Sequence, residues 1–381
     1  MDIVAVSNSN VLDYLNDPSP RTLGRSALEW LDQLQKPTII RVAGRDRSRT
    51  RAMATLLHGN EPSGLLALHR WLLEQHTPAV NMLFLLGGIY PAKIPPTLSW
   101  RQLPDGRDLN RCFKEPFEGE EGAIARAMLV ELHNAKPECL LDVHNTSGSG
   151  PAFAVSITND AAHQALTSLF TDRLIITDLR LGALMEYSEQ EVPTVTIECG
   201  GSQDEQAHEL AYEGLVRYCS RPDVLSLEKA DWDVTVLRNP IRVELAPEAT
   251  IEYRLEPTGH ADLTFPPDIE HRNFGIVSPD EPLGWVGKKG LGILTAIGHN
   301  RKENMTQVLQ VRDGKIYPAQ ALRTFMITTN PVIAKSDCLF YAVKATGEPF
   351  FDAKRSGGSS RTSVLRELIC DSRCGRWIYQ Y

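Results

Sequence analysis

The first 220 residues contain two kinds of hydrophobic pattern, short apolar runs and apolar residues at helical spacing. Short runs of β-branched or other apolar residues predict buried strands, and these runs lie at residues 38–42, 52–57, 82–87, 138–144, 152–157 and 193–197. Apolar residues at helical spacing predict amphipathic helices, and these segments span residues 19–34, 61–76, 123–133, 160–170 and 203–220. Because strands and helices alternate, we expect an α/β fold with a mixed, largely parallel sheet flanked by helices.

The pattern changes in the second half of the chain. Between about residue 231 and residue 344, the apolar runs are short, alternate with polar residues and are broken by Pro and Gly. Four of these runs predict strands, at residues 234–237, 241–245, 250–255 and 307–311. We therefore expect an α/β domain at residues 1–225, a second, mostly β domain at 226–345, and a C-terminal tail at 346–381 whose placement stays open.

A charged stretch separates the first two predicted strands. It carries an arginine at every second position, with Arg45, Arg47, Arg49 and Arg51 in a row. Such a cluster could bind phosphate, but a solvent-exposed hairpin turn is the simpler interpretation in a protein of net negative charge. We therefore predict a hairpin turn here.

Chain length, net charge and cysteine content limit the classes of protein to which this chain can belong. The chain has 381 residues, a net charge of −8, and 42% hydrophobic and 23% charged residues, as expected for a globular protein of two domains. The negative charge argues against a nucleic-acid partner, and no apolar run reaches the roughly 20 residues that cross a membrane. No signal-like segment follows Met1, and the seven cysteines are scattered without a Cys-x-x-Cys pair. We expect a cytoplasmic protein with reduced, mostly buried thiols.

Polar residues stand at the ends of three predicted strands. His58, His144 and Glu198 each end a different strand, and Glu61 follows His58 by three residues. Because ligands of such sheets bind at the carboxyl ends of the strands, we expect these residues to share one site. Two histidines and a glutamate can hold zinc and leave a position for water, while a further carboxylate acts as a base. These residues indicate a zinc hydrolase.

Four motifs, in this order, resemble those of a known family. They are His58-Gly59-Asn60-Glu61, Asp108-Leu109-Asn110-Arg111, Asp142-Val143-His144-Asn145-Thr146 and Thr196-Ile197-Glu198-Cys199-Gly200. Over about residues 50 to 200, the chain is similar to the succinylglutamate desuccinylase and aspartoacylase family, which belongs to the zinc carboxypeptidase clan. The resemblance implies that the first domain is a zinc-binding catalytic domain with a zinc carboxypeptidase-like fold.

The resemblance also implies the metal ligands and the base. His58, Glu61 and His144 correspond to the ligands of one zinc ion, and Glu198 corresponds to the catalytic carboxylate. Zinc lowers the pKa of a bound water to about 7, so Glu198 can take a proton from that water and deliver it to the departing amine. Asp142 lies two residues before His144 on the same strand face. It could orient this histidine through its second nitrogen or form a buried salt bridge, and both interpretations stay open.

A set of substrate-binding residues follows from the same resemblance. Asn110 and Arg111 correspond to the pair that holds a substrate carboxylate, which a planar guanidinium can bind through two hydrogen bonds. The family also has an arginine before this pair that polarises the scissile carbonyl. Arg101 and Arg107 compete for that role. We favour Arg101 as the catalytic arginine, because residues 104–106 resemble an insertion after it, and we keep Arg107 as a candidate for substrate binding.

Two departures from the family pattern leave the substrate open. Aspartoacylases have an arginine about ten residues before the catalytic glutamate, for the second carboxylate of their substrate, and this chain has none there. Arg180 is too distant in sequence to replace it safely. The family also contributes a tyrosine from its second domain, and Tyr317 and Tyr341 are both candidates.

We therefore predict a zinc-dependent deacylase that hydrolyses the amide bond of N-acyl amino acids or similar small amides, with metal-activated water and a glutamate base. One alternative is a zinc carboxypeptidase that acts on short peptides, since it needs the same metal, base and carboxylate-binding pair. A second alternative is a non-catalytic binding protein with the same fold. The expected partner is a small-molecule substrate bearing a carboxylate, with neither nucleic acid nor membrane involved, and a homo-oligomer is left open.

Overall fold

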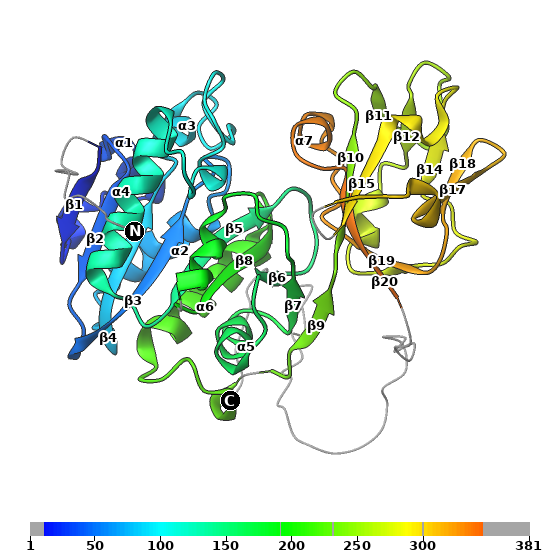
Figure 1. Ribbon diagram of the computed structural model, residues 1–381. Coiled ribbons are helices and arrows are strands. Elements are labelled where there is room, and N and C mark those ends of the chain that lie inside the picture. Colours follow the sequence, from blue (N-terminus) through cyan, green and yellow to red (C-terminus); the bar gives the residue numbers. More distant parts are fainter. Residues whose placement is uncertain (1–10, 191, 231, 299–300, 346–381) are drawn as a thin grey trace, which may run out of the picture. The chain divides into compact units, whose positions relative to one another are not determined.

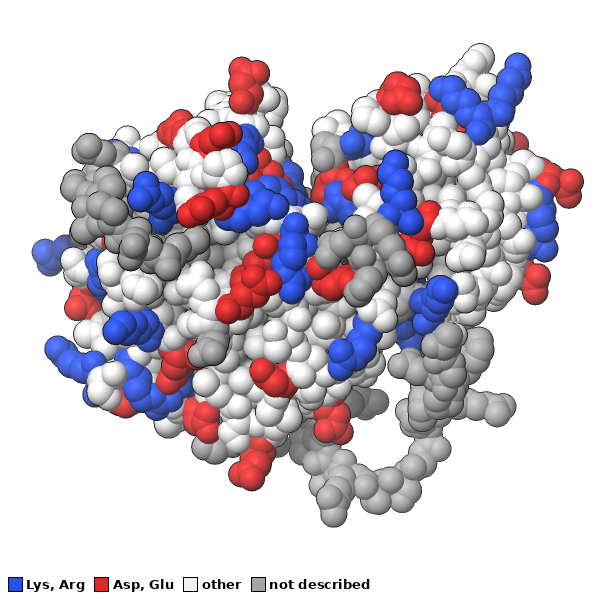
Figure 2. All heavy atoms as spheres, viewed as in Figure 1, with Lys and Arg blue, Asp and Glu red and all other residues white. Residues whose placement is uncertain are grey.

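The computed structural model describes residues 11–190, 192–230, 232–298 and 301–345 (Figure 1). The predicted C-terminal tail, residues 346–381, lies outside the described residues. Within the described ranges, no helix has both the length and the apolar character needed to cross a membrane. On the face of the molecule drawn in Figure 2, acidic and basic side chains are interspersed.

A nine-stranded sheet forms the first part of the fold. Its strands are β1 (Asp13–Asn16), β2 (Thr38–Val42), β3 (Asp46–Thr55), β4 (Val80–Leu86), β5 (Leu140–Thr146), β6 (Phe153–Ser156), β7 (Arg173–Ile176), β8 (Thr194–Gly201) and β9 (Thr235–Arg238). They are arranged in the order β1-β2-β4-β3-β5-β8-β6-β7-β9. Only the pairs β2–β4 and β6–β8 of this sheet are antiparallel. The expected mixed, largely parallel sheet is confirmed.

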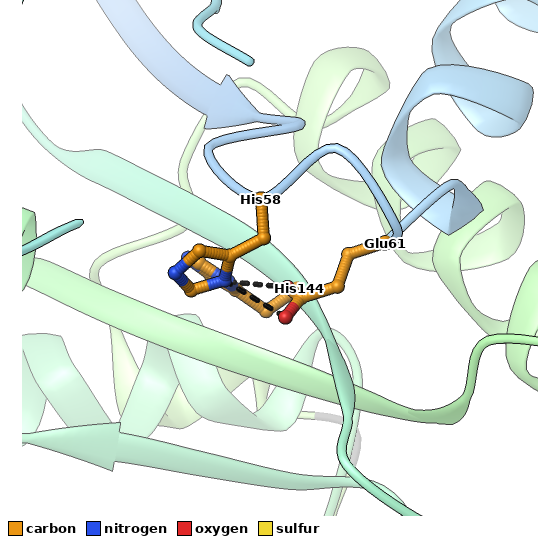
Figure 3. A group of neighbouring side chains, drawn as sticks. All are labelled: His58, Glu61 and His144. Carbon is orange, nitrogen blue, oxygen red and sulfur yellow. Dashed lines mark hydrogen bonds and ion pairs between the residues drawn. The ribbon is translucent and has the colours of Figure 1, made fainter. Parts of the chain in front are cut away.

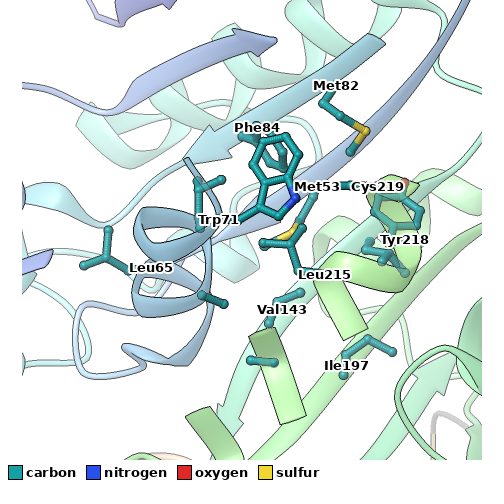
Figure 4. Close-up of a cluster of buried hydrophobic side chains, with 14 of the residues drawn as sticks. Met53, Leu65, Trp71, Met82, Phe84, Val143, Ile197, Leu215, Tyr218 and Cys219 are labelled. Atoms are coloured by element: carbon teal, nitrogen blue, oxygen red, sulfur yellow. The ribbon is translucent and has the colours of Figure 1, made fainter. Parts of the chain in front are cut away.

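Helices cover both faces of this sheet. The α-helices are α1 (Ala27–Gln33), α2 (Ser63–Leu73), α3 (Ile89–Lys93), α4 (Gly119–Ala135), α5 (Ala161–Ser168) and α6 (Glu205–Ser220). Because side chains alternate along a strand, Met53 packs against α2 and α6 on one face, whereas its neighbour Ala52 packs against α4 on the other. Figure 4 shows Trp71 of α2 and Tyr218 of α6 over the strands on the first face. Two apolar cores thus hold the sheet in place and fix the ends of its strands.

The rest of the described chain is mostly β-structure. One sheet has the order β13-β19-β20-β10-β15-β16 and a second has the order β11-β12-β14-β18-β17. The strands are β10 (Ile241–Leu245), β11 (Ile251–Tyr253), β12 (Leu263–Phe265), β13 (Ile276–Val277), β14 (Gly284–Val286), β15 (Leu294–Gly298), β16 (Arg301–Glu303), β17 (Leu309–Arg312), β18 (Lys315–Pro318), β19 (Leu322–Phe325) and β20 (Phe340–Lys344), and helix α7 spans Pro331–Ser336. The expected second, β-rich region is confirmed.

Short 3-10 segments connect several of these elements. They are η2 (Pro20–Thr22), η3 (Leu109–Arg111), η4 (Leu184–Gln190), η5 (Leu227–Lys229), η6 (Ile269–Arg272), η7 (Gly290–Ile293) and η8 (Met305–Gln307). Strand β9 belongs to the nine-stranded sheet, so this sheet continues beyond the predicted domain boundary at residue 225. The division of the chain at that residue stays a prediction.

The first predicted helix is shorter than its apolar spacing suggested. We expected a helix over residues 19–34, but α1 begins at Ala27. Gly24 has a φ of +66°, a left-handed conformation that interrupts a right-handed helix. Ser26 then caps the helix, because its side chain accepts a hydrogen bond from the backbone N–H of Glu29.

The prediction of a hairpin turn in the arginine run is wrong. Strand β4 lies between β2 and β3, and Arg47, Arg49 and Arg51 belong to β3 itself, which begins directly after Arg45. Arg51 is fully buried, and its guanidinium donates to the Glu138 carboxylate at 2.6 Å. It also donates to three main-chain carbonyls at the end of α6 and just after it, those of Tyr218, Arg221 and Pro222. Burial is possible because each of these donors has a partner.

Candidate active site

The three proposed metal ligands come from two neighbouring strands. His58 and Glu61 lie in the turn between β3 and α2, and His144 lies in β5, which pairs with β3. Figure 3 shows the side chains of both histidines converging on the carboxylate of Glu61. The turn needs a glycine at position 59, because a Cβ atom on Gly59 would lie 2.4 Å from the backbone nitrogen of Ala92. The close approach of two backbones therefore shapes the His-Gly-Asn-Glu motif.

The donor atoms of these residues could hold a metal ion. His58 Nδ1 lies 2.8 Å from Glu61 Oε1, and His144 Nδ1 lies 2.6 Å from Glu61 Oε2. All three residues are buried, and their ligand atoms lie within 4.8 Å of one another. Two imidazole nitrogens and one carboxylate are the donor set of many catalytic zinc sites. The residues present therefore fit a zinc ion.

A carboxylate orients each histidine through its second nitrogen. His144 Nε2 lies 2.9 Å from Asp142 Oδ2, and His58 Nε2 lies 2.9 Å from Asp108 Oδ1. Such contacts fix the ring so that Nδ1 points into the site. This contact of Asp142 with His144 is the one that both interpretations require, an orienting hydrogen bond and a buried salt bridge. The corresponding role of Asp108 was missed, although Asp108 opens the second motif.

The electrostatics of the cluster favour a cation. Burial opposes the charged form of each histidine, but the surrounding carboxylates outweigh this effect. Glu61 and Asp108 leave the pKa of His58 raised, and Asp142 and Glu61 leave the pKa of His144 raised well above its usual value. Burial alone would raise the pKa of Glu61, but the two histidines hold it well below its usual range. The carboxylates thus create a negative potential at the histidine nitrogens.

Glu198 stands beside this cluster on the next strand. In the pairing of β5 with β8, Glu198 is the register partner of His144. Its Oε2 atom is buried and has no hydrogen-bond partner among the described residues. Burial raises the pKa of Glu198 to about 8, and the charge of Glu61 adds to this shift. A carboxylate held in this way, next to a possible metal, is suited to exchange a proton with a substrate or a water molecule.

Arg101 and Asn110 also reach this site. Arg101 forms an ion pair with Asp108 at 3.0 Å, and its Nη1 lies 3.4 Å from Glu61 Oε1. The carbonyl oxygen of the Asn110 side chain accepts a hydrogen bond from the backbone N–H of Leu184 at 2.9 Å. The amide nitrogen of Asn110 lies 3.4 Å from His144 Nε2, and Asn110 lines the pocket.

Arg111 lines the same pocket. Its Nη1 donates to the backbone carbonyl of Asn110 at 2.8 Å, and its Nη2 lies 3.8 Å from the carboxylate of Asp337. The pocket is also lined by Glu198, Arg101 and the three proposed metal ligands. We call these ligands, His58, Glu61 and His144, together with the contacting carboxylates of Asp108 and Asp142, the metal-ligand cluster.

The structure does not bring Arg107 or Arg180 to this pocket. Arg107 donates to the backbone carbonyl of Glu118 and lines a neighbouring hollow instead. Arg180 forms an ion pair with Glu189 at 2.5 Å and is largely solvent-accessible. Of Arg101 and Arg107, the two candidates for the catalytic arginine, only Arg101 lies beside the proposed metal ligands.

The β-rich region contributes Tyr341 to the pocket. Its hydroxyl accepts a hydrogen bond from Arg242 at 2.9 Å, and its ring stacks on Phe325 with centroids 5.6 Å apart. Tyr317, the other candidate, instead packs its ring against the guanidinium of Arg312. Sequence reasoning also missed Asp337, which belongs to no recognised motif.

Comparison with known proteins identifies solved structures that share this fold. No protein-family model and no curated protein matches this chain. A succinylglutamate desuccinylase/aspartoacylase structure from Rhodobacter sphaeroides is 14% identical, with 80% of this chain and 87% of that chain covered and a TM-score of 0.51. A protein from Shewanella frigidimarina with the same family name is 13% identical, with 81% and 92% covered and a TM-score of 0.52.

A third similar structure is the product-bound ectoine utilization protein EutE (DoeB) from Ruegeria pomeroyi. It is 15% identical, with 80% of this chain and 88% of that chain covered and a TM-score of 0.50. Many of the similar solved structures are succinylglutamate desuccinylase/aspartoacylase family proteins. At these identities the likeness shows that the chain has the fold of those proteins.

Proposed function

We propose that this protein is a zinc-dependent hydrolase that cleaves the amide bond of N-acyl amino acids or similar small amides. The observation that carries this proposal is the convergence of His58, Glu61 and His144 beside Glu198, whose Oε2 has no partner among the described residues. A metal site that only stabilises the fold needs no such carboxylate. Hydrolysis needs one, because a proton must leave the attacking water and reach the departing nitrogen.

Each residue of the pocket has a separate role in the proposed reaction. The chemistry supplied by a bound zinc ion is polarisation of the scissile carbonyl and a lowered pKa of the attacking water. Glu198 accepts the proton of that water and then donates it to the departing amine. Arg101 directs positive charge toward the oxygen of the scissile carbonyl, where negative charge develops, and such preorganised charge is typically worth about 3 kcal/mol.

Asn110 and Arg111 are suited to hold the carboxylate of the substrate. The side chain of Asn110 offers an amide N–H, and Arg111 offers a planar guanidinium. The names of the similar structures, desuccinylase and aspartoacylase, support the cleavage of an acylated amino acid. Tyr341 stands on the opposite, β-rich side of the pocket and would contact the part of the substrate beyond the amide.

The decisive experiment separates the base from the metal ligands. In Glu198→Gln, we expect turnover of N-acyl amino acids to fall at least about 100-fold, while the zinc content stays that of the wild type. In His58→Ala, we expect zinc to be lost. Zinc content is measured by atomic emission, and turnover by release of the free amine.

Glu189→Gln is the matched control, because it makes the same chemical change at an exposed glutamate outside the pocket. Wild-type turnover in Glu198→Gln would contradict the assignment of the base. Turnover of short peptides without deacylation would instead identify a carboxypeptidase.

A further inference from the structure

The pocket continues from the metal-ligand cluster into an apolar chamber. Its wall includes Phe153, Val155, Ile175, Leu181, Met185 and Phe325. These residues come from β6, β7, the segment before η4 with η4 itself, and β19, so packing of distant segments creates this wall. A substrate that fills the chamber gains free energy by removing apolar surface from water.

Few charged side chains of this pocket are available to contact a substrate. Beyond the metal-ligand cluster and Glu198, the charged side chains that line it among the described residues are Arg101, Arg111 and Asp337. Arg101 is already engaged, because it pairs with Asp108 at 3.0 Å and approaches Glu61 at 3.4 Å. Arg111 donates to one backbone carbonyl, and its nearest carboxylate, Asp337, lies 3.8 Å away. Its ion pairing is weaker than that of Arg101, so Arg111 is the guanidinium better suited to receive a substrate carboxylate.

Asp337 places a negative charge next to Arg111. Its side chain is 10% exposed, and its Oδ1 accepts a hydrogen bond from Arg242 at 3.0 Å. Burial would raise the pKa of Asp337, but the charges of Arg101 and Arg242 outweigh it and leave the pKa lowered, so the carboxylate is ionised at neutral pH. A second carboxylate on a substrate would lose its hydration and face this like charge.

We propose that this site takes a substrate with a single carboxylate and an uncharged, apolar remainder, and that Asp337 is the specificity-determining residue that rejects a second carboxylate. The apolar group can be the acyl chain or the side chain of the amino acid, since both flank the scissile amide. This inference rests on the proposed amide hydrolysis at the same site.

The first test measures kcat/KM of the zinc-loaded protein for two pairs of substrates of similar size, and each pair forms one arm of the test. N-acetylleucine and N-acetylaspartate differ in the amino-acid side chain, whereas N-pentanoylglycine and N-succinylglycine differ in the acyl chain. We expect one of the two apolar substrates to have a kcat/KM at least about tenfold higher than that of either acidic substrate. If this substrate is N-acetylleucine, the apolar group is the amino-acid side chain; if it is N-pentanoylglycine, the apolar group is the acyl chain. An acidic substrate within tenfold of the better apolar substrate overturns the inference.

The second test removes the negative charge of Asp337. In Asp337→Asn, we expect the ratio of kcat/KM for the acidic compound to that for the apolar compound, in the arm that the first test identifies, to rise at least about tenfold. Glu244→Gln is the matched control, because Glu244 also pairs with Arg242, at 2.7 Å, but does not line the pocket. An unchanged ratio in Asp337→Asn overturns the role of this residue.

A binding measurement separates this inference from the proposed function. Zinc-loaded Glu198→Gln is titrated calorimetrically with all four compounds. At least about tenfold tighter binding of one apolar compound than of both acidic ones supports the inference even if the wild type hydrolyses none of the four, an outcome that would count against the proposed function alone. Equal or tighter binding of an acidic compound overturns the inference.

Discussion

Two clusters of charged side chains lie near opposite ends of β5, and they differ in how completely their polar groups are paired. Before the strand begins, Glu138 accepts hydrogen bonds from Arg49 and Arg51. Toward its other end, His144 lies among the carboxylates of Asp142 and Glu61. We call the first the arginine cluster; the second is the metal-ligand cluster.

In the arginine cluster, each charged group meets an opposite charge or a carbonyl oxygen. The guanidinium of Arg51 donates to Glu138 and to main-chain carbonyls, so it is fully buried without an unpaired donor in the contacts described above. In the metal-ligand cluster, carboxylates outnumber the histidines, and Glu198 Oε2 has no partner among the described residues. The paired cluster is suited to stabilise the fold, and the incompletely paired one is suited to bind a cation and react.

The largest effect on stability is expected in the arginine cluster. Arg51→Met removes the charge that Glu138 and several buried carbonyls need, and breaking a buried pair in this way costs about 3 to 5 kcal/mol. The free energy of unfolding, measured by urea denaturation, should fall by that amount while zinc binding at 10 °C is retained.

Arg180→Met is the control for this change, since Arg180 pairs with Glu189 at the surface and such pairs are worth at most about 1 kcal/mol. Equal losses of stability in the two variants would refute the distinction between a buried and an exposed arginine.

A smaller effect, on metal affinity, is expected in the metal-ligand cluster. Asp142→Asn weakens the contact that orients His144, and loss of such a contact typically lowers metal affinity about 10- to 100-fold. Zinc affinity is measured by competition with a chromophoric chelator.

Asp160→Asn provides the comparison, because Asp160 also contacts a histidine, His163, at 2.8 Å but lies outside the pocket. Unchanged zinc affinity in Asp142→Asn would show that His144 needs no orienting carboxylate.

The smallest effect, counted per pH unit, is a pH dependence of stability in the metal-free protein. Burial raises the pKa of Glu198 from 4.5 to about 8, so the folded protein holds a proton between these values that the unfolded chain has released. Stability is therefore lost as the pH rises through this window, by about 1.4 kcal/mol per pH unit for one proton. Glu198→Gln should remove this component of the slope in urea denaturation from pH 5 to pH 8.

Glu189→Gln again serves as the control, because its side chain is mostly exposed. Parallel slopes for the wild type and Glu198→Gln would mean that Glu198 is already ionised in the folded, metal-free protein.

Sequence reasoning predicted much of the metal-ligand cluster and little of the arginine cluster. His58, His144 and Glu198 could be grouped because each stands at the end of a predicted strand, and parallel strands bring such ends together. Arg51 was placed in an exposed turn, because its partners include carbonyls around residue 220, far away along the chain. A side chain that depends on distant backbone atoms gives no local signal of its burial.

By itself, the sequence determined the α/β architecture, the β-rich region that follows it and the set of candidate metal ligands. These features follow from local periodicity and from short motifs, whose residues are positioned by the elements that carry them. Only the tertiary structure placed Arg101 and Tyr341 in the pocket, with Arg107 and Tyr317 outside it, and brought Asp337 beside Arg111. The walls and charges of the pocket come from segments that meet only through packing, and packing depends on the whole chain.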